Sequence, residues 1–134
     1  MACAFISTLV IQSYSSSLNL LSPIDLRVTE IKRNSVSLQW ADRASAEAGY
    51  EVWRATQSNG SYSLLTSLAA GITSYTNAGL TQNTTYYYTV RSKGASSTYS
   101  AYSNAVTATT YGYSIYVNFT NTNQPPSAWN NLNA

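Results

Sequence analysis

Apolar and polar residues alternate along this chain with a period of two, and turn residues interrupt the alternation at short intervals. A period of two sends successive side chains to opposite faces of a strand, so the pattern predicts half-buried β-strands. No segment of useful length carries the 3.6-residue apolar spacing of a helix, and helix is expected to be essentially absent. The chain is therefore predicted to be an all-β sandwich.

Seven alternating stretches lie between Pro23 and Thr110. The dipeptide Asn59-Gly60 predicts a turn before the fourth stretch, and Asn77-Ala78-Gly79 predicts a turn after the fifth. The predicted strands cover residues 24–29, 35–40, 50–53, 62–68, 72–76, 85–92 and 104–110.

Both ends of the chain lie outside this array, so three regions are predicted: an N-terminal extension (1–21), a sandwich (22–111) and a C-terminal strand with a tail rich in Pro and Asn (112–134). Residues 4–11 and 113–120 are strand-like. Their apolar side chains are candidates for assembly contacts: Phe5, Leu9, Ile11, Ile115, Val117 and Phe119. The N-terminal stretch also has some character of a leader remnant, although no Lys or Arg precedes its apolar run.

Exposed strands of this kind are unfavourable when alone. Each large apolar side chain left in water forgoes about 1.5–3 kcal/mol of burial, and an unpaired strand edge is a template for pairing with another chain. The ends therefore either fold onto their own domain or complete a neighbouring copy by strand addition. The second alternative predicts a homo-oligomer or polymer.

Composition excludes several classes of function. Charged residues make up 9% of the chain, against about 25% in a typical domain, whereas Ser, Thr and Asn supply 49 of the 134 residues. The absence of His removes the commonest general base and metal ligand, and one Cys cannot form an internal disulfide. A net charge of +2 is no footprint for nucleic acid, and no apolar run is long enough to span a membrane. We expect no enzyme activity, no metal and no cofactor.

One run carries a family resemblance. Leu80-Thr81-Gln82-Asn83-Thr84-Thr85-Tyr86-Tyr87-Tyr88-Thr89-Val90 resembles the Leu-x-Pro-Gly-Thr-x-Tyr-x-x-x-Val run of fibronectin type III domains, with Gln-Asn in place of Pro-Gly. The resemblance covers residues 23–110 and implies a seven-stranded antiparallel immunoglobulin-like β-sandwich. It also implies that Tyr86 is the tyrosine corner, that Trp40 is the buried Trp of the second strand and that Leu80 belongs to the core.

Two other stretches are similar to bacterial secreted proteins. Residues 49–54 and 102–110 look like the bacterial branch of the family, whose modules are strung between domains of secreted enzymes and surface proteins. Val117-Asn118-Phe119 with Trp129-Asn130-Asn131 resembles the opening of a further module in secreted proteins of Bacteroidetes-type bacteria. A linker stiffened by Pro125 and Pro126 is the alternative.

The third and sixth strands carry a candidate binding face. If they are neighbours, as in the family, Glu51, Trp53, Tyr87 and Arg91 face outward together with Thr89, and Tyr99 and Tyr102 either extend the patch or cover the end of the sandwich. Aromatic rings beside polar groups suit a polysaccharide or another protein. The alternative is plain cross-strand pairing, of Trp53 with Tyr87 and of Glu51 with Arg91.

These observations favour a non-catalytic extracellular or cell-surface subunit with a structural or adhesive role, self-associating through its terminal strands. Two alternatives stay open. One is a spacer module from a larger secreted bacterial enzyme or surface protein, and the other is a carbohydrate-binding accessory module that uses Trp53 and Tyr87.

Overall fold

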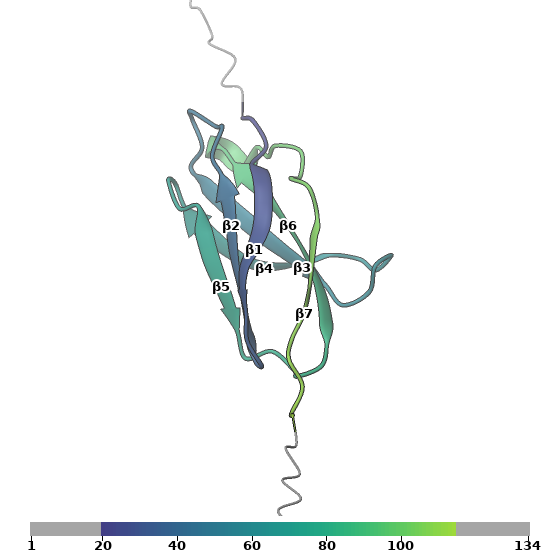
Figure 1. Cartoon of the computed structure of the whole chain (residues 1–134). Coiled ribbons are helices and arrows are strands. Elements are labelled where there is room, and N and C mark those ends of the chain that lie inside the picture. The colour runs from purple at the N-terminus through teal and green to yellow at the C-terminus, as the bar shows by residue number, and fades with distance from the viewer. Residues whose placement is uncertain (1–19, 115–134) are drawn as a thin grey trace, which may run out of the picture.

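A computed structural model describes residues 20–114 of the chain, which form a pair of antiparallel sheets packed face to face (Figure 1). The three-stranded sheet has the order β1-β2-β5, and the four-stranded sheet has the order β4-β3-β6-β7. The predicted all-β immunoglobulin-like sandwich is confirmed. Its strands are β1 (Ile24–Ile31), β2 (Ser35–Ala41), β3 (Gly49–Ala55), β4 (Ser63–Ala69), β5 (Ser74–Ala78), β6 (Thr85–Lys93) and β7 (Val106–Thr109).

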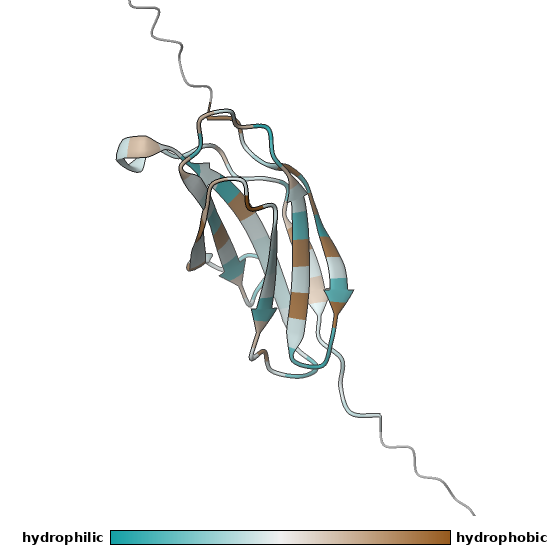
Figure 2. Cartoon of the chain, turned by 90° about the vertical axis from the view of Figure 1, so that its left-hand side faces the viewer, coloured by the Kyte–Doolittle hydropathy of each residue, from teal (hydrophilic) through white to brown (hydrophobic). Residues whose placement is uncertain are grey.

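The core forms where the inward positions of the two sheets meet. On β2, residues Val36, Leu38 and Trp40 are buried and alternate with half-buried polar neighbours. Figure 2 shows the same alternation as hydrophobic and hydrophilic bands along single strands. The core residues that face them come mainly from β3 and β6: Tyr50, Val52, Tyr86, Tyr88 and Val90.

The structure places each of the residues Tyr86, Trp40 and Leu80 in the core of the sandwich. The Tyr86 hydroxyl accepts a hydrogen bond of 3.0 Å from the backbone N–H of Thr81, five residues upstream, which is the geometry of a tyrosine corner. Trp40 is 3% exposed and its ring lies 5.8 Å from that of Tyr50, while Leu80 is also buried in the core.

The fifth strand begins later than the alternation predicts and includes Asn77, where the sequence predicts a turn. Asn77 is buried and pairs with Val36 on β2, and its Nδ2 donates a hydrogen bond of 3.0 Å to the Tyr88 hydroxyl across the core. A turn residue is tolerated in the strand because the core supplies a partner for its amide. The turn itself lies at Gly79, whose φ of +72° suits glycine.

Two further details differ from the sequence expectation. A single 3₁₀ turn, η1 (Ala95–Ser97), follows β6, and β7 is shorter than the predicted 104–110. Gly49, at the start of β3, approaches the carbonyl oxygen of Leu68 on β4 so closely that a Cβ there would collide with it. The predicted terminal strands 4–11 and 113–120, with their candidate assembly residues, lie wholly or mostly outside the described residues.

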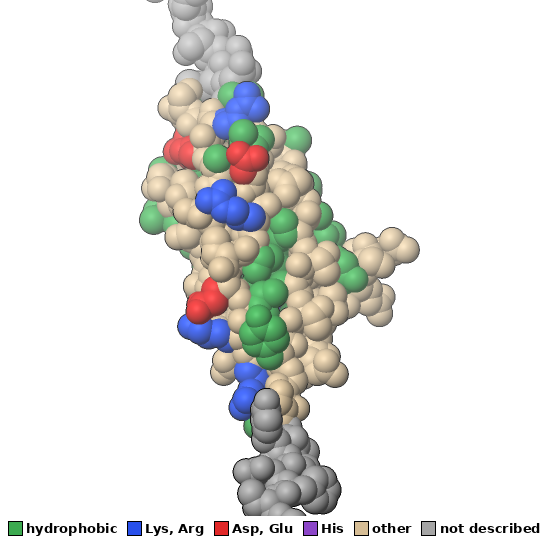
Figure 3. Space-filling model, viewed as in Figure 1, with side chains coloured by type: hydrophobic (Ala, Val, Ile, Leu, Met, Phe, Trp, Pro, Cys, Tyr) green, Lys and Arg blue, Asp and Glu red, His purple; other side chains and the backbone are tan. Residues whose placement is uncertain are grey.

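The described chain enters and leaves the sandwich at opposite ends. β1 begins near one end of the long axis, and the segment after β7 leaves at the other (Figure 1). Figure 3, viewed from the same side as Figure 1, shows hydrophobic side chains in a strip along the length of the molecule, with charged side chains mainly to one side of this strip. No helix within residues 20–114 has the length and hydropathy needed to cross a membrane.

Candidate functional site

The outer face of the four-stranded sheet carries an ion pair at its centre. Glu51 on β3 lies directly opposite Arg91 on β6. The Arg91 Nε and Nη2 atoms both approach Glu51 Oε2, at 2.9 and 2.8 Å, and the Trp53 indole Nε1–H donates to the same oxygen at 3.2 Å. One carboxylate oxygen thus accepts hydrogen bonds from Arg91 Nε–H and from the Trp53 indole, both charge-assisted because the acceptor is ionised, and it also forms the ion-pair contact with Arg91 Nη2.

Three aromatic rings surround the guanidinium of this ion pair. The Arg91 Cζ atom lies 3.9 Å from the ring centroid of Tyr99, 4.9 Å from that of Trp53 and 5.2 Å from that of Tyr102. Trp53 and Tyr102 also meet edge to face, with centroids 5.9 Å apart. We call these five residues (Glu51, Trp53, Arg91, Tyr99 and Tyr102) the Arg91 cluster. A cation over aromatic faces contributes about 0.5–2 kcal/mol per contact, depending on desolvation.

The segment between η1 and β7 brings two of these rings into place. It runs beside β6, where the N–H of Ser100 donates to the carbonyl of Ser92 at 3.0 Å and the N–H of Ser103 donates to that of Val90 at 2.8 Å. Tyr99 and Tyr102 are thereby held against the outer face of the sheet. Alternation along the strands does not reveal this contact, because the segment has no alternation of its own.

The structure separates the predicted outward residues into two groups. Glu51, Trp53 and Arg91 meet, but Tyr87 lies opposite Ala55 and Thr107 rather than opposite Trp53, whose partner on β6 is Thr89. The cross-strand pairing expected for Glu51 with Arg91 is present, whereas Trp53 packs on Tyr102 in place of Tyr87. Glu51 is also only 4% exposed. The Glu51 carboxylate is therefore not exposed on the outward face as strand alternation predicts, because the other members of the Arg91 cluster cover it.

A cavity of about 380 Å³ opens beside the Arg91 cluster. It is lined by Tyr62 from the β3–β4 loop, by Thr89 on β6, and by Tyr102 and Ala105 from the segment before β7. Its walls carry two aromatic rings, one hydroxyl-bearing strand residue and no formal charge. This is the type of lining that small-molecule sites use.

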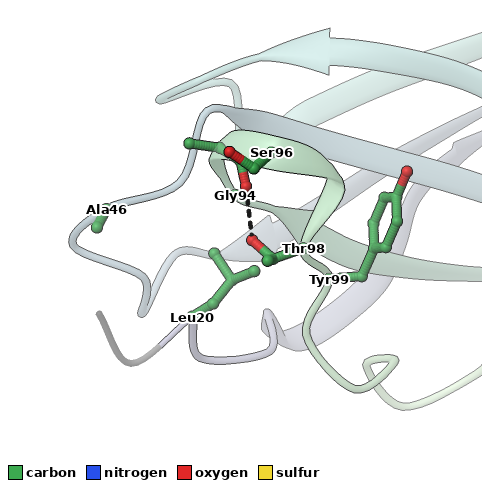
Figure 4. Close-up of a pocket in the computed structure, with 7 residues that line it drawn as sticks. Leu20, Ala46, Gly94, Ser96, Thr98 and Tyr99 are labelled. Carbon is green, nitrogen blue, oxygen red and sulfur yellow. Dashed lines mark hydrogen bonds between the residues drawn. The ribbon is translucent and has the colours of Figure 1, made fainter. Parts of the chain in front are cut away.

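A second cavity, of about 390 Å³, lies at the end of the sandwich where the described chain begins (Figure 4). Tyr99, a member of the Arg91 cluster, is among the residues that line this second cavity. Thr98 Oγ1 donates to the Ala95 carbonyl at 2.9 Å, and Gly94 leaves no room for a Cβ beside that hydroxyl. The remaining lining residues are Leu20, Ala46, Ala95 and Ser96.

The acidic residues of the loop after β2 form no comparable site. Asp42 Oδ1 accepts a hydrogen bond of 2.8 Å from the N–H of Ala44, as in an Asx turn. Among residues 20–114, His, Cys, Asp and Glu side chains do not gather in threes at a spacing that would hold a metal ion.

Comparison with known proteins identifies the fold. The family model described as "Fibronectin type III domain" matches residues 21–109. No curated protein matches the chain. An Fn3-like protein from Clostridium thermocellum has a TM-score of 0.56 and 25% identity, over 69% of this chain and 94% of that one.

Two of the similar structures are much longer enzymes. A β-1,2-glucanase from Parabacteroides distasonis has a TM-score of 0.62 and 20% identity, over 71% of this chain and 13% of the glucanase. Pectate lyase PelI from Erwinia chrysanthemi, solved in complex with tetragalacturonic acid, has a TM-score of 0.51 and 27% identity, over 62% of this chain and 26% of the lyase. The chain therefore corresponds to a small part of each enzyme.

Proposed function

This chain belongs to the fibronectin type III family, and from that premise we propose that it is a non-catalytic module that spaces the parts of a longer extracellular protein. The observation that carries the proposal is the position of the two ends of the described chain, which leave the sandwich at opposite poles (Figure 1). A module built in this way adds its own length between whatever precedes it and whatever follows it.

The rigidity of the sandwich supports a spacing role. β3 pairs with both β4 and β6, and the two sheets share one contiguous core. The Arg91 cluster adds an ion pair, with three aromatic rings packed around its guanidinium, on the outer face. A spacer needs this kind of fixed geometry, since a flexible linker of the same number of residues sets no defined distance.

The comparisons support the same proposal. The glucanase and the pectate lyase each contain a segment with this fold, and the segment makes up 13% and 26% of their chains. The resemblance of residues 117–119 and 129–131 to the opening of a further module points in the same direction. A secreted enzyme or surface protein that acts on polysaccharide is the parent that we propose, and its location is extracellular.

Two copies of the chain joined in tandem test the proposal. In light scattering, the single chain should behave as a monomer of 14.6 kDa at all concentrations. In small-angle X-ray scattering, the tandem pair should exceed the single chain in maximum dimension by nearly one module length. A tandem pair that folds back to a compact particle would contradict a spacing role.

Self-association through the terminal strands, which the alternation in the terminal segments favours, is the outcome that would replace this proposal. It requires ordered oligomers of the single chain that disappear in Leu9→Lys or Val117→Lys. Ser16→Lys and Thr122→Lys add the same charge to polar stretches of the same terminal segments, and they serve as matched controls.

A further inference from the structure

We propose that the cavity beside the Arg91 cluster is a binding site for an uncharged oligosaccharide. The proposal goes beyond the spacing role and does not depend on it, since a module can hold a glycan whether or not it separates two domains. It rests on the charge balance of the cluster, on the chemistry of the cavity walls and on the shape of the surface.

The charge balance indicates a neutral ligand. Arg91 is the cation of the cluster beside the cavity, and both its Nε and its Nη2 are directed at Glu51 Oε2. The aromatic rings of Tyr99, Trp53 and Tyr102 lie within 3.9–5.2 Å of its guanidinium carbon, and its side chain is 19% exposed. An anionic sugar would have to displace Glu51, whose side chain is 5% exposed, and would leave that carboxylate buried without its partner.

The cavity walls match the two-sided chemistry of a sugar. Tyr62 and Tyr102 line the hollow, and Tyr102 is 45% exposed. A tyrosine ring offers an apolar face for the C–H side of a pyranose and a hydroxyl for its polar rim. Among the described residues, neither of these two hydroxyls takes part in a hydrogen bond, whereas Thr89 Oγ1 already meets Ser103. The hydroxyls of these two lining tyrosines therefore have unused donors and acceptors.

The shape of the surface favours an extended chain of sugars over a flat protein contact. The cavity beside Tyr102 is concave and, at about 380 Å³, lies within the size range of small-molecule sites. Tyr99, whose ring centroid lies 3.9 Å from the same guanidinium carbon, is among the residues that line the second cavity of about 390 Å³ (Figure 4). Two hollows bordered by exposed rings of one rigid cluster suit a linear ligand that occupies one hollow and continues toward the other.

The test is a titration of the isotope-labelled full chain with defined neutral oligosaccharides, followed in amide and indole NMR spectra. The probes are the hexasaccharides of cellulose, xylan, laminarin and β-1,2-glucan, with hexagalacturonate as the anionic comparison. For at least one neutral probe we expect shifts at Thr89, Tyr102, Ala105 and the Trp53 indole, and no binding of hexagalacturonate.

Substitutions locate the site. Tyr102→Ala should weaken binding about tenfold or more, because it removes one aromatic wall. Tyr62→Phe keeps the second ring and loses only its hydroxyl, so its effect should be smaller. Tyr111→Ala removes a tyrosine that is 60% exposed and lies after β7, outside the cavity lining, and should bind as the unaltered chain does. Urea denaturation of each variant verifies that it is folded.

Several results would overturn the proposal. These are no binding by any neutral probe, binding that persists in both Tyr102→Ala and a Tyr62→Ala variant, or a preference for hexagalacturonate. Oligomers of the chain that Tyr102→Ala dissolves would reassign this surface to a protein contact. None of these outcomes bears on the maximum dimension of the tandem pair, so the spacing role stands or falls separately.

Discussion

At the scale of single residues, two buried tyrosines show how differently the same hydroxyl can contribute. The hydroxyl of Tyr86 accepts the N–H of Thr81, so a backbone donor near the turn is satisfied. The hydroxyl of Tyr50 is fully buried and has no hydrogen-bond partner among the described residues, as is also true of the Trp40 indole nitrogen. Removing the two hydroxyls should therefore have opposite consequences.

Tyr86→Phe should lower the free energy of unfolding by about 1–3 kcal/mol, because the Thr81 N–H loses its acceptor while the ring keeps its packing. Urea denaturation measures the change. Tyr87→Phe, one residue along the same strand but on the outer face, is the control and should change stability by less than about 0.5 kcal/mol. Equal effects of the two substitutions would contradict a structural role for the tyrosine corner.

Tyr50→Phe should leave stability at neutral pH unchanged or raise it by up to about 1 kcal/mol, since a buried hydroxyl without a partner carries a desolvation cost. Burial raises the pKa of Tyr50 above its ordinary value. The Asp42 carboxylate raises this pKa further, both as an acceptor for the protonated hydroxyl and by its charge, and the charge of Glu47 adds to the effect. Above about pH 10, tyrosines of the unfolded chain lose protons while folded Tyr50 keeps its own. Stability therefore falls as pH rises, with a slope given by the difference in bound protons.

The alkaline loss of stability should be smaller in Tyr50→Phe than in the unaltered chain. Burial also raises the pKa of Tyr88, so some of the slope persists in this variant. Urea denaturation at pH 7 and at two values above pH 10 measures the difference, with Tyr111→Phe as the exposed control. A steeper alkaline slope in Tyr50→Phe would contradict this account of its burial.

At the scale of elements, the sequence predicts the strands because burial on one face enforces their alternation. β2 shows this most simply, with Val36, Leu38 and Trp40 inward and serines and a glutamine between them. Asn77 departs from the prediction because its strand position depends on the Tyr88 hydroxyl, which comes from another sheet. Local composition marks Asn as a turn former, and a tertiary partner overrides that preference.

The candidate site is less predictable than the strands, for a related reason. The pairing of Glu51 with Arg91 follows once β3 and β6 are neighbours. The burial of Glu51 and the stacking of Tyr99 on Arg91 depend on how the segment before β7 folds back along β6. The sequence names Tyr99 and Tyr102 only as possible extensions of the face, because a loop without a periodic pattern does not show which strand residues its side chains contact.

The side chain of Asn104, which lies just before β7, bonds to the backbone of β1 in the other sheet. β1 loses register with β2 around Asp25, whose φ is +54°, and the backbone of Leu26 bonds to the Asn104 side chain at this irregularity. The Leu26 N–H donates to Asn104 Oδ1 at 3.1 Å, and Asn104 Nδ2 donates to the Leu26 carbonyl at 2.9 Å. One amide thus replaces a rung of the ladder at a bulge.

Asn104→Ala should lower the free energy of unfolding by about 1–3 kcal/mol, because it leaves the N–H and the carbonyl of Leu26 without partners. In this variant the Leu26 amide should also exchange with solvent faster than the amides of its neighbours on β1. Hydrogen exchange measured by NMR detects the difference. Asn59→Ala, in the exposed β3–β4 loop, is the matched control. Unchanged exchange at Leu26 would contradict the bridging role.

At the scale of the whole molecule, charge is confined to the sandwich. All twelve charged side chains lie between Asp25 and Lys93, and residues 1–19 and 115–134 contain none. Contacts through these terminal segments would therefore respond weakly to salt. The ion pair of the Arg91 cluster would also respond weakly, because its burial limits screening by dissolved ions. Salt dependence alone does not separate spacing from self-association, and truncation is the more decisive measurement.

A chain of residues 20–114 should unfold with a free energy within about 1 kcal/mol of the full chain, because it contains the whole contiguous core. A chain that begins at Pro23 should lose about 1 kcal/mol more, since Ser92 Oγ then lacks the Leu21 carbonyl to which it donates at 2.8 Å. Urea denaturation of the three chains gives both differences. A loss of several kcal/mol in residues 20–114 would mean that the terminal segments pack on their own sandwich. Their apolar side chains would then be inaccessible to a neighbouring copy, and strand addition between copies would fail for the same reason.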